Sequence, residues 1–423
     1  MFTKKSMKRT LSLALGLSLF LAACGNGDSA SSEEDVTLTY SIWDAIQEPG
    51  MQAIADAFEE ENPGIKVNVE VTPWEQYWTK LESSAQGGSM PDVFWMHSNE
   101  IANYSEGNVL MDLSETFESS ENVKLDQFPE DLVELYSADG ELLGVPKDYD
   151  TIGLWYNKSL FDEAGIEYPD EDWTWDDLLV AAQELTDEEA GVYGVLAPLN
   201  RQEGYHNFIY QNDGYVISED KTESGFRKDE TVDAVQWYAD LSVKHGVSPT
   251  QNQFADNSNL TFFQSGRGAM AFFGSWMTAE MANNEYTAEN VDVAPLPQGE
   301  KQATIFNGLA NSVAENTKYP QEAQKFVEFL SSEKAMKLQG ENGSAIPALE
   351  GIDTTFNEAY PEFNTQIFTD QMESGVIKPY TNQTTRWENI ENEQLIPVFA
   401  GEKSAKEVAE DIADQVEDIL ADE

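Results

Sequence analysis

Over residues 36–96, segments with the two-residue hydrophobic period of a strand alternate with segments that have the 3.6-residue period of a helix. Residues 36–42, 65–71 and 91–96 read as strands, the first two with alternation of period two. Residues 49–61 and 73–85 carry apolar side chains at helical intervals. In the second segment these include Trp74, Tyr77 and Trp78, for which the helical spacing favours the core, although Trp78 could also line the edge of a cleft. The order strand, helix, strand, helix, strand predicts a mainly parallel sheet covered by helices.

The rest of the chain continues in mixed elements, and its last segment, 408–420, predicts an amphipathic helix that docks on the body. Thr174 is the expected cap of one internal helix. The other expected elements are two strand pieces within 142–156, strands over 269–273 and 291–296, helices over 161–165, 175–185, 231–244, 322–330 and 333–338, and a helix end at 260–266.

The first residues have a pattern unlike the rest. Four basic residues lie among the first nine, and an uncharged stretch over 11–23 follows and ends in Leu21-Ala22-Ala23-Cys24. This pattern predicts a signal peptide over 1–23. Two alternatives remain open: an ordinary signal peptide cut near Ala23, with no role for Cys24, and an anchor that is not cleaved. Residues 24–35, which are small, polar and acidic, predict a flexible tether.

The chain is strongly acidic, with 78 Asp and Glu against 24 Lys and Arg, a net charge of −54. Nucleic-acid phosphates need cationic partners, so the charge argues against a nucleic-acid ligand. His97, His206 and His245 lie far apart, and Cys24 is the only cysteine, so the spacing predicts no metal site and no cofactor. Carboxylates are so abundant that a chance pair carries little weight as a catalytic signal.

Five segments, in order, carry a resemblance that covers most of residues 36–420. They are 58–67 (FEEENPGIKV), 88–94 (GSMPDVF), 141–157 (ELLGVPKDYDTIGLWYN), 160–178 (LFDEAG followed by WTWDDL) and 266–276 (GRGAM followed by GSW). The set is similar to bacterial extracellular solute-binding proteins of family 1, the maltose-binding group of ABC importers. Leu-Ala-Ala-Cys likewise resembles a bacterial lipobox, which implies that Cys24 is acylated, with palmitate, and anchors the protein outside the cytoplasmic membrane.

The resemblance implies a periplasmic-binding-protein fold of class II, with two α/β lobes, a hinge and an interlobe cleft. We expect lobe 1 to comprise 36–148 plus 303–349 and lobe 2 to comprise 149–302 plus 350–423. Ligands bind open sheets outside the carboxyl ends of the strands, which agrees with a cleft there.

A sugar site needs aromatic rings for the C–H face and amides or carboxylates for the hydroxyls. Trp43 and Asp44 follow the first expected strand, and His97 and Ser98 follow the third. Their position makes them candidate ligand contacts. The alternatives are a core tryptophan with an aspartate helix cap, and a loop in which Ser98 caps the next helix.

Further candidates come from the resemblance. Tyr149 and Asp150 stand where the family crosses between lobes, and its matching aspartate often binds a sugar hydroxyl; a hinge role is the alternative. Trp276 matches a tryptophan that commonly stacks on the sugar, and packing is the alternative. The remaining candidates are Asn307 and Asn311 on the returning crossing, Arg386 and Trp387 after a polar loop, and, with less support, Trp78, Gln202 and Glu203.

The sequence thus predicts a non-enzymatic, monomeric lipoprotein that captures a sugar, with an oligosaccharide favoured. It would deliver the sugar by hinge closure to ABC permease subunits and their ATPase. Three alternatives remain open: a polyamine or other solute in the same fold, a surface glycosidase using two carboxylates, and a sensory or adhesive lipoprotein.

Overall fold

The computed structural model describes residues 35–423, which form one compact unit. The predicted signal peptide, Cys24 and all but the last residue of the predicted tether lie outside the described residues. Within the described part, no helix has the length and apolar character that crossing a membrane requires.

The first sheet has five strands, in the order β2-β1-β3-β11-β6, and four of them come from the N-terminal part of the described chain. The strands are β1 (Val36–Ile42), β2 (Ile65–Val71), β3 (Val93–Met96), β6 (Val145–Pro146) and β11 (Ala310–Val313). β1 runs parallel to β2 and β3, so the predicted parallel core of the sheet is confirmed. β11 enters antiparallel from a distant part of the chain, beside β3.

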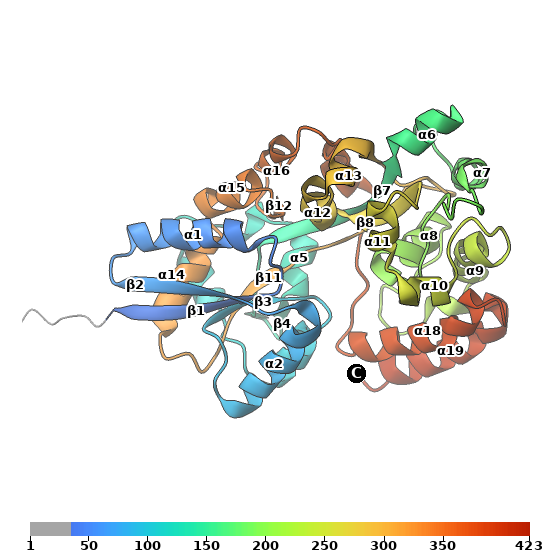
Figure 1. Cartoon of the computed structure of the whole chain (residues 1–423). Helices are drawn as coiled ribbons and strands as arrows, with labels where there is room; N and C mark the ends of the chain where they lie inside the picture. The colour runs from blue at the N-terminus through green and yellow to red at the C-terminus, as the bar shows by residue number, and fades with distance from the viewer. Residues whose placement is uncertain (1–34) are drawn as a thin grey trace, which may run out of the picture. The chain divides into compact units, whose positions relative to one another are not determined.

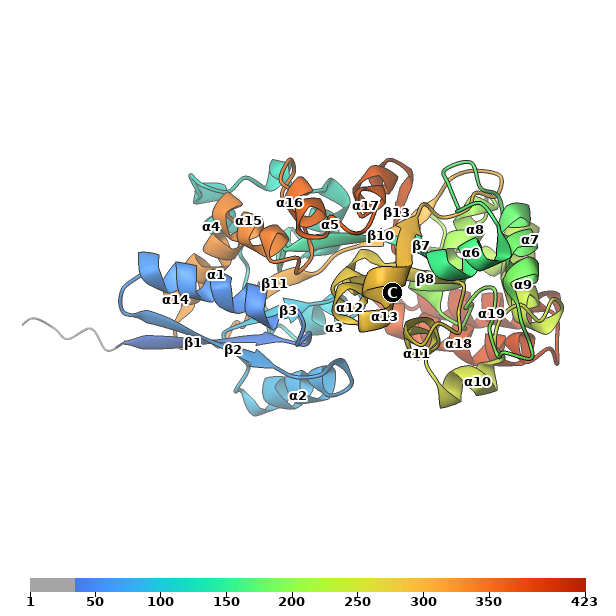
Figure 2. The ribbon, with the colours of Figure 1, turned by 45° about the horizontal axis from the view of Figure 1, so that its top comes forward.

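Helices cover both faces of this sheet. α1 (Glu48–Glu61) and α2 (Trp74–Gly87) lie on opposite faces of β1 and β2 in both views (Figures 1 and 2). α14 (Pro320–Leu330) and α15 (Glu333–Glu341) pack beside α1. Phe58, Phe326 and Phe329 join their rings in the core between them, which explains the helical apolar stripes of these segments. Shorter helices complete this part: α3 (Ile101–Glu106), α4 (Ser114–Ser119) and α5 (Glu130–Leu135), with the small hairpin β4 (Ser137–Ala138) and β5 (Glu141–Leu142).

A second sheet is built around β7 (Asp148–Asn157), a ten-residue strand that is almost wholly buried. Its other strands are β8 (Met270–Gly274), β9 (Val291–Ala294), β10 (Thr304–Asn307), β12 (Ile346–Pro347) and β13 (Gly375–Ile377). β8, β9, β10 and β12 all pair with β7 in antiparallel register.

The helices around the second sheet include the C-terminal pair α18 (Thr384–Phe399) and α19 (Ala405–Leu420), which lie beside α9 (Figure 1). α19 buries Val408, Ile412, Val416 and Leu420, so the predicted docking helix is confirmed. Thr174 caps α7 through a capping box, also as predicted. The remaining helices are α6 (Lys158–Ala164), α7 (Trp175–Leu185), α8 (His206–Gln211), α9 (Asp229–Val243), α10 (Gln251–Asp256), α11 (Asn259–Gln264), α12 (Thr278–Asn283), α13 (Glu285–Asn290), α16 (Thr354–Ala359) and α17 (Gln366–Asp370).

The chain passes between the two sheets over very short segments. β6 and β7 are separated by Lys147 alone, and β10 and β11 by Gly308 and Leu309. The two segments are joined by hydrogen bonds, from Lys147 N to Leu309 O (2.8 Å) and from Leu309 N to Asp148 Oδ1 (2.7 Å). A Cβ on Gly308 would lie 2.2 Å from the carbonyl oxygen of Asp148, so only glycine allows this approach. The predicted lobe boundaries themselves remain a prediction.

Candidate functional site

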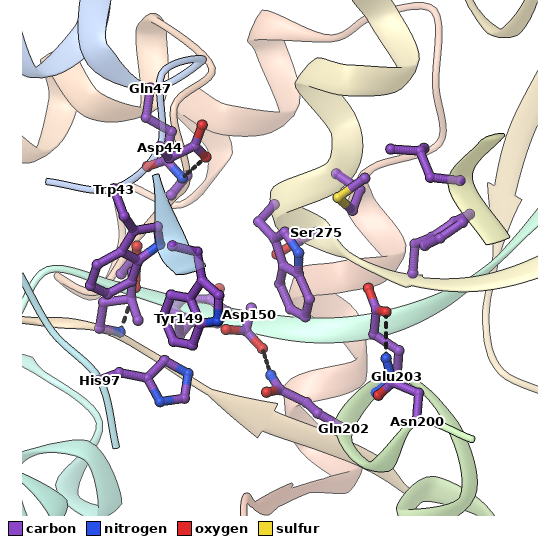
Figure 3. A pocket seen from close by; sticks show the side chains of 18 of the residues that line it. Trp43, Asp44, Gln47, His97, Tyr149, Asp150, Asn200, Gln202, Glu203 and Ser275 are labelled. Atoms are coloured by element: carbon purple, nitrogen blue, oxygen red, sulfur yellow. Dashed lines mark hydrogen bonds between the residues drawn. The ribbon is translucent and has the colours of Figure 1, made fainter. Parts of the chain in front are cut away.

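A cavity of about 640 Å³ opens where residues of both sheets meet. Figure 3 shows Tyr149 and Asp150 between two groups, with Trp43 and His97 on one side and Asn200 and Glu203 on the other. The twenty lining residues are Trp43, Asp44, Gln47, Trp74, His97, Asp148, Tyr149, Asp150, Asn200, Gln202, Glu203, Ser258, Asn259, Leu260, Phe273, Ser275, Trp276, Met277, Leu309 and Ala345.

Eight of the residues predicted from the sequence line this cavity together, although the first and last are 233 positions apart. They are Trp43, Asp44, His97, Tyr149, Asp150, Gln202, Glu203 and Trp276. Trp43 and His97 directly follow β1 and β3, so the ends of neighbouring strands bring them together as the sheet argument expects. The fold thus assembles most of the predicted contacts in one place; that they bind a ligand stays a prediction.

Three predicted polar residues lie behind the cavity surface. Ser98 is buried beside His97, with its Oγ 3.4 Å from Nδ1 of the ring. Asn307 is buried on β10, and its Nδ2 lies 3.5 Å from Nε2 of His97. Asn311 sits in the middle of the first sheet, where its Oδ1 accepts a hydrogen bond from Tyr40 at 2.8 Å. Ser98 and Asn307 thus contact the lining residue His97, whereas Asn311 contacts Tyr40, and none of the three lines the cavity.

The predicted pair Arg386 and Trp387 is placed elsewhere, on the first turn of α18. Trp387 is fully buried in the core, with Nε1 donating to Thr381 Oγ1 at 3.1 Å. Arg386, about 100° around the helix, donates to Gln383 on the surface. The fold instead brings Arg201 close to the cavity, where it pairs with Glu388 at 3.3 Å. The two residues predicted on α18 therefore do not line the cavity. The sequence did not show which side of this helix faces the core.

Trp78 lines a different hollow, together with Glu82, Glu100 and Tyr104. The neighbouring Trp74 lines the main cavity, although its helical spacing with Tyr77 predicted a core stripe. Trp74 is the first residue of α2 and is 42% exposed, whereas Tyr77 is buried against β1 and β3. The signal available in the sequence was the position of Trp74 directly after Pro73, at the start of a helix.

The remaining lining residues were not predicted. Gln47 lies just before α1, Asn200 just before a π-helical turn, and Ser275 just after β8. Each stands at an element end, which is a general signal for cleft positions, but it selects too many residues to be specific. The others are Asp148, Ser258, Asn259, Leu260, Phe273, Met277, Leu309 and Ala345.

The side of the cavity next to the first sheet is an aromatic wall, which we define as Trp43, Trp74 and His97. The Trp43 ring centroid lies 5.1 Å from that of Trp74 and 5.0 Å from that of Trp95, both edge to face. Tyr77 contacts Trp43 in the same way at 5.1 Å. Because Trp95 and Tyr77 are core residues, the aromatic wall is anchored directly in the core.

His97 belongs to this wall in its neutral form. Burial and the nearby Lys378 cation lower the pKa of His97 to about 3. The backbone N–H of Asn99 donates to Nδ1 at 3.2 Å, so this ring nitrogen serves as an acceptor. The imidazole therefore contributes a polar edge without a charge.

A polar wall runs from the middle of the cavity to the opposite side, and we define it as Asp150, Asn200, Gln202 and Glu203. Asp150 lies on β7, whereas the other three belong to the π-helical turn Arg201–Tyr205 and the residue before it. Gln202 Nε2 donates to Asp150 Oδ1 at 2.9 Å, and Asn200 Nδ2 donates to Glu203 Oε2 at 3.0 Å. The hydrogen bonds among its own members therefore hold this wall in shape (Figure 3).

Both carboxyl groups of the polar wall resist ionisation. Burial raises the pKa of Glu203 to about 7, although the Gly274 backbone and Asn200 donate hydrogen bonds to it. Burial, with the charge of Asp148 nearby, raises the pKa of Asp150 well above its usual value. Both groups are available as hydrogen-bonding partners to a ligand in the cavity.

Trp276 reaches the cavity from the end of β8 by lying across a glycine. A Cβ on Gly274 would stand 1.9 Å from the Trp276 ring, so no other residue leaves room for the indole in this position. The cavity therefore offers indole faces and a set of amide and carboxyl groups. This combination suits non-covalent binding of a ligand that has both apolar C–H faces and hydroxyl groups.

Comparison with protein families gives one match, the model described as bacterial extracellular solute-binding protein, over residues 44–337. Among curated relatives, a maltooligosaccharide ABC transporter solute-binding lipoprotein of Streptococcus pneumoniae is 24% identical over 99% of this chain and 98% of its own length. The maltodextrin-binding protein of Bacillus subtilis is 24% identical over 95% of this chain and 94% of its own.

Solved structures agree. An ABC substrate-binding protein from Listeria monocytogenes in complex with cycloalternan superposes with a TM-score of 0.85, at 26% identity, covering 92% of this chain and 99% of that one. The GacH receptor of Streptomyces glaucescens, solved unliganded and in complex with acarbose, superposes with a TM-score of 0.81, at 24% identity, with the same coverage of both chains.

Proposed function

Because the chain belongs to the bacterial extracellular solute-binding proteins, we propose that it captures an oligosaccharide in the cavity and delivers it to an ABC importer. The predicted family and fold class are confirmed, and so is the prediction that the chain is not an enzyme, since the family consists of binding proteins. Membership in this family also rules out the predicted alternative of a surface glycosidase.

The observation that carries the proposal is the pairing of the two walls across one cavity. Indole faces of Trp43, Trp74 and Trp276 match the C–H faces of pyranose rings, and the polar wall offers partners for the hydroxyl groups. A volume of about 640 Å³ is large enough for more than a monosaccharide. Relatives whose names specify maltooligosaccharides and maltodextrins support the same ligand class.

The proposed mechanism is hinge closure between lobe 1 (36–148 plus 303–349) and lobe 2 (149–302 plus 350–423). The short crossings at Lys147 and at Gly308-Leu309 are the proposed hinge. A sugar that contacts both walls stabilises the closed form, and the permease recognises that form. The proposed partners are permease subunits, their ATPase and, through acylated Cys24, the outer face of the cell membrane; the working unit is a monomer.

The direct test is a thermal-shift screen followed by calorimetric titration against mono- and oligosaccharides. A bound sugar raises the melting temperature by mass action, because it binds only the folded protein. A shift from spermidine or a peptide, with no shift from any sugar, would overturn the substrate class.

One substitution ties binding to the cavity. Trp276→Ala should weaken sugar binding at least about tenfold, because an aromatic face against the sugar is lost. Trp237→Ala is the matched control, since Trp237 packs on Phe208 and Trp175 and does not line the cavity. Equal affinity in the Trp276 variant and the unmodified protein would remove this tryptophan from the site.

A further inference from the structure

The cavity has an unusual charge balance. Four of its lining residues are acidic, and among the described residues that line it there is no lysine or arginine. Asp148 is neutralised from below by Lys147, whose Nζ lies 2.5 Å from Oδ2. Asp44, Asp150 and Glu203 form no ion pair within the described part of the chain.

The cations nearest to the cavity are already paired. Lys378 lies 2.6 Å from Glu388, and Arg201 lies 3.3 Å from the same carboxylate. Both Lys378 and Glu388 are buried, so this pair is not free to turn toward a ligand. No described cation therefore pairs directly with the three remaining acids; Lys378 acts on Asp150 only from a distance, while it is paired with Glu388.

Carboxylates held in a partly enclosed cavity without a cation lose hydration and gain no counter-charge. The raised pKa values of Asp150 and Glu203 express this cost. In the described part of the chain, Asp150 has one carboxyl oxygen without a hydrogen-bond donor. Its Oδ1 accepts a hydrogen bond from Gln202, whereas no described donor reaches Oδ2. A ligand with a protonated amine can supply both the charge and the missing donor.

We propose that the preferred ligand is an amino sugar, an oligosaccharide carrying at least one protonated amine, with its ammonium group at Asp150. The inference rests on the proposed function and narrows its substrate class. Indole faces on both sides of the cavity favour sugar rings over a flexible polyamine chain, which has no face to stack. The absence of a lining cation among the described residues likewise disfavours acidic or phosphorylated sugars.

The experiment is calorimetric titration near pH 6 with two matched pairs of neutral and amine-bearing sugars. One pair is cellotriose and the trimer of β-1,4-linked glucosamine; the other is maltotetraose and acarbose, which carries a secondary amine. In a pair that binds, the amine-bearing member should bind about tenfold tighter, the effect of one charge-assisted hydrogen bond.

Variants locate the effect. Asp150→Asn keeps the shape and should reduce the ratio of amine to neutral affinity to about one, whatever its effect on the neutral sugar. Asp411→Asn is the charge-matched control, because Asp411 is exposed on α19 and does not line the cavity; the ratio should stay unchanged. Melting curves confirm that both variants are folded.

The outcomes separate the two proposals. A neutral sugar that binds as tightly as its amine-bearing partner, or a ratio that Asp150→Asn leaves intact, overturns the amino-sugar inference and leaves sugar capture standing. Binding of spermidine with no binding of any sugar overturns both. An equal loss of the ratio in Asp411→Asn assigns the preference to the overall negative charge and also overturns the inference.

Discussion

The two walls of the cavity are held in place by different forces. The aromatic wall rests on the core, because Trp43 packs its ring against Trp95 and Tyr77. The polar wall rests on its own hydrogen bonds, between Gln202 and Asp150 and between Asn200 and Glu203. Core packing therefore holds the stacking surfaces in place. The polar groups depend instead on a few directional hydrogen bonds, each of which a single substitution can remove.

The largest effect is expected where the two walls are fixed to each other. Lys378 donates both to Asn99, two residues after His97, and to Glu388, which also pairs with Arg201 at the start of the polar turn. Although burial opposes ionisation, the cations of Lys378 and Arg201 lower the pKa of Glu388. Glu388→Gln should cost about 4 kcal/mol in the free energy of unfolding, because the buried cation of Lys378 and the partly buried cation of Arg201 lose their partner.

Urea unfolding measures this cost, with Glu410→Gln on the exposed face of α19 as the control, expected to change stability by less than about 0.5 kcal/mol. A loss below about 1 kcal/mol in Glu388→Gln would show that the walls are not coupled through this ion cluster.

The second prediction separates the roles within the aromatic wall. Trp43→Ala should lower the unfolding free energy by about 3 kcal/mol, because it removes ring contacts to the core, and should also weaken sugar binding. Trp74→Ala should weaken binding to a similar degree at a stability cost of about 1 kcal/mol, since Trp74 is 42% exposed. Paired urea melts and titrations check this; equal stability costs would contradict a wall anchored through Trp43.

The third prediction concerns the polar wall and has a pH signature. The folded pKa of Glu203 is about 7, above the unfolded value of 4.5. The stability contribution of this group is therefore complete below about pH 4.5 and is lost as the pH rises through about 7, since the unfolded chain ionises first.

Glu203→Gln should be about 1 kcal/mol less stable than the unmodified protein near pH 4, where only the weakened hydrogen bond counts, and about 2 kcal/mol more stable near pH 8. The pKa difference accounts for about 3 kcal/mol, less about 1 kcal/mol for a weakened hydrogen bond. Unfolding measured at both pH values checks this. A difference that does not change with pH would show that the carboxyl group is ionised in the folded state.

A smaller effect is expected at Gly274, beneath the Trp276 ring. Gly274→Ala places a methyl group in the space of the indole, which must swing away. We expect a loss of about 1 kcal/mol in stability, because a side chain and not the backbone must move, with a loss of about tenfold in sugar affinity. Gly165→Ala is an unsuitable control because of its positive φ; Gly87→Ala, with only Ser89 nearby, is the better one.

The smallest effect is expected at Arg386. Arg386→Ala removes only an exposed contact to Gln383, so affinity should change less than about twofold. Titration with the best sugar measures this. A large loss would mean that α18 turns toward the ligand on closure and would make the polar wall larger than the structure shows.

The sequence predicted the helices and strands well where the hydrophobic period and the turn residues at the segment ends agreed. β1, α1 and β2 follow the predicted ranges closely, because each has a clear period and ends at turn residues such as Asn62-Pro63-Gly64. α19 followed from its apolar spacing alone. Site residues at strand ends, Trp43 and His97, were also predictable, since the open-sheet rule gives them a place.

Other features were beyond local reasoning. Trp387 and Arg386 carry suitable chemistry, yet the rotation of α18 turns one into the core and leaves the other on the surface. Asn311 is polar on a predicted crossing, but β11 lies inside the first sheet, between β3 and β6, and the Asn311 amide oxygen accepts a hydrogen bond from Tyr40. Trp74 was expected in the core and lines the cavity.

By itself the sequence determined the alternation of strands and helices, the acidity and the family, because these depend on residue order and composition. The tertiary structure alone decided which residues share the cavity, because the end of β8 and the turn at 200–205 meet the strand ends of the first sheet from far along the chain. It also decided which acids go without a cation, since packing brings Arg201 to Glu388 from 187 positions away and brings no cation into contact with Asp150 or Glu203 among the described residues.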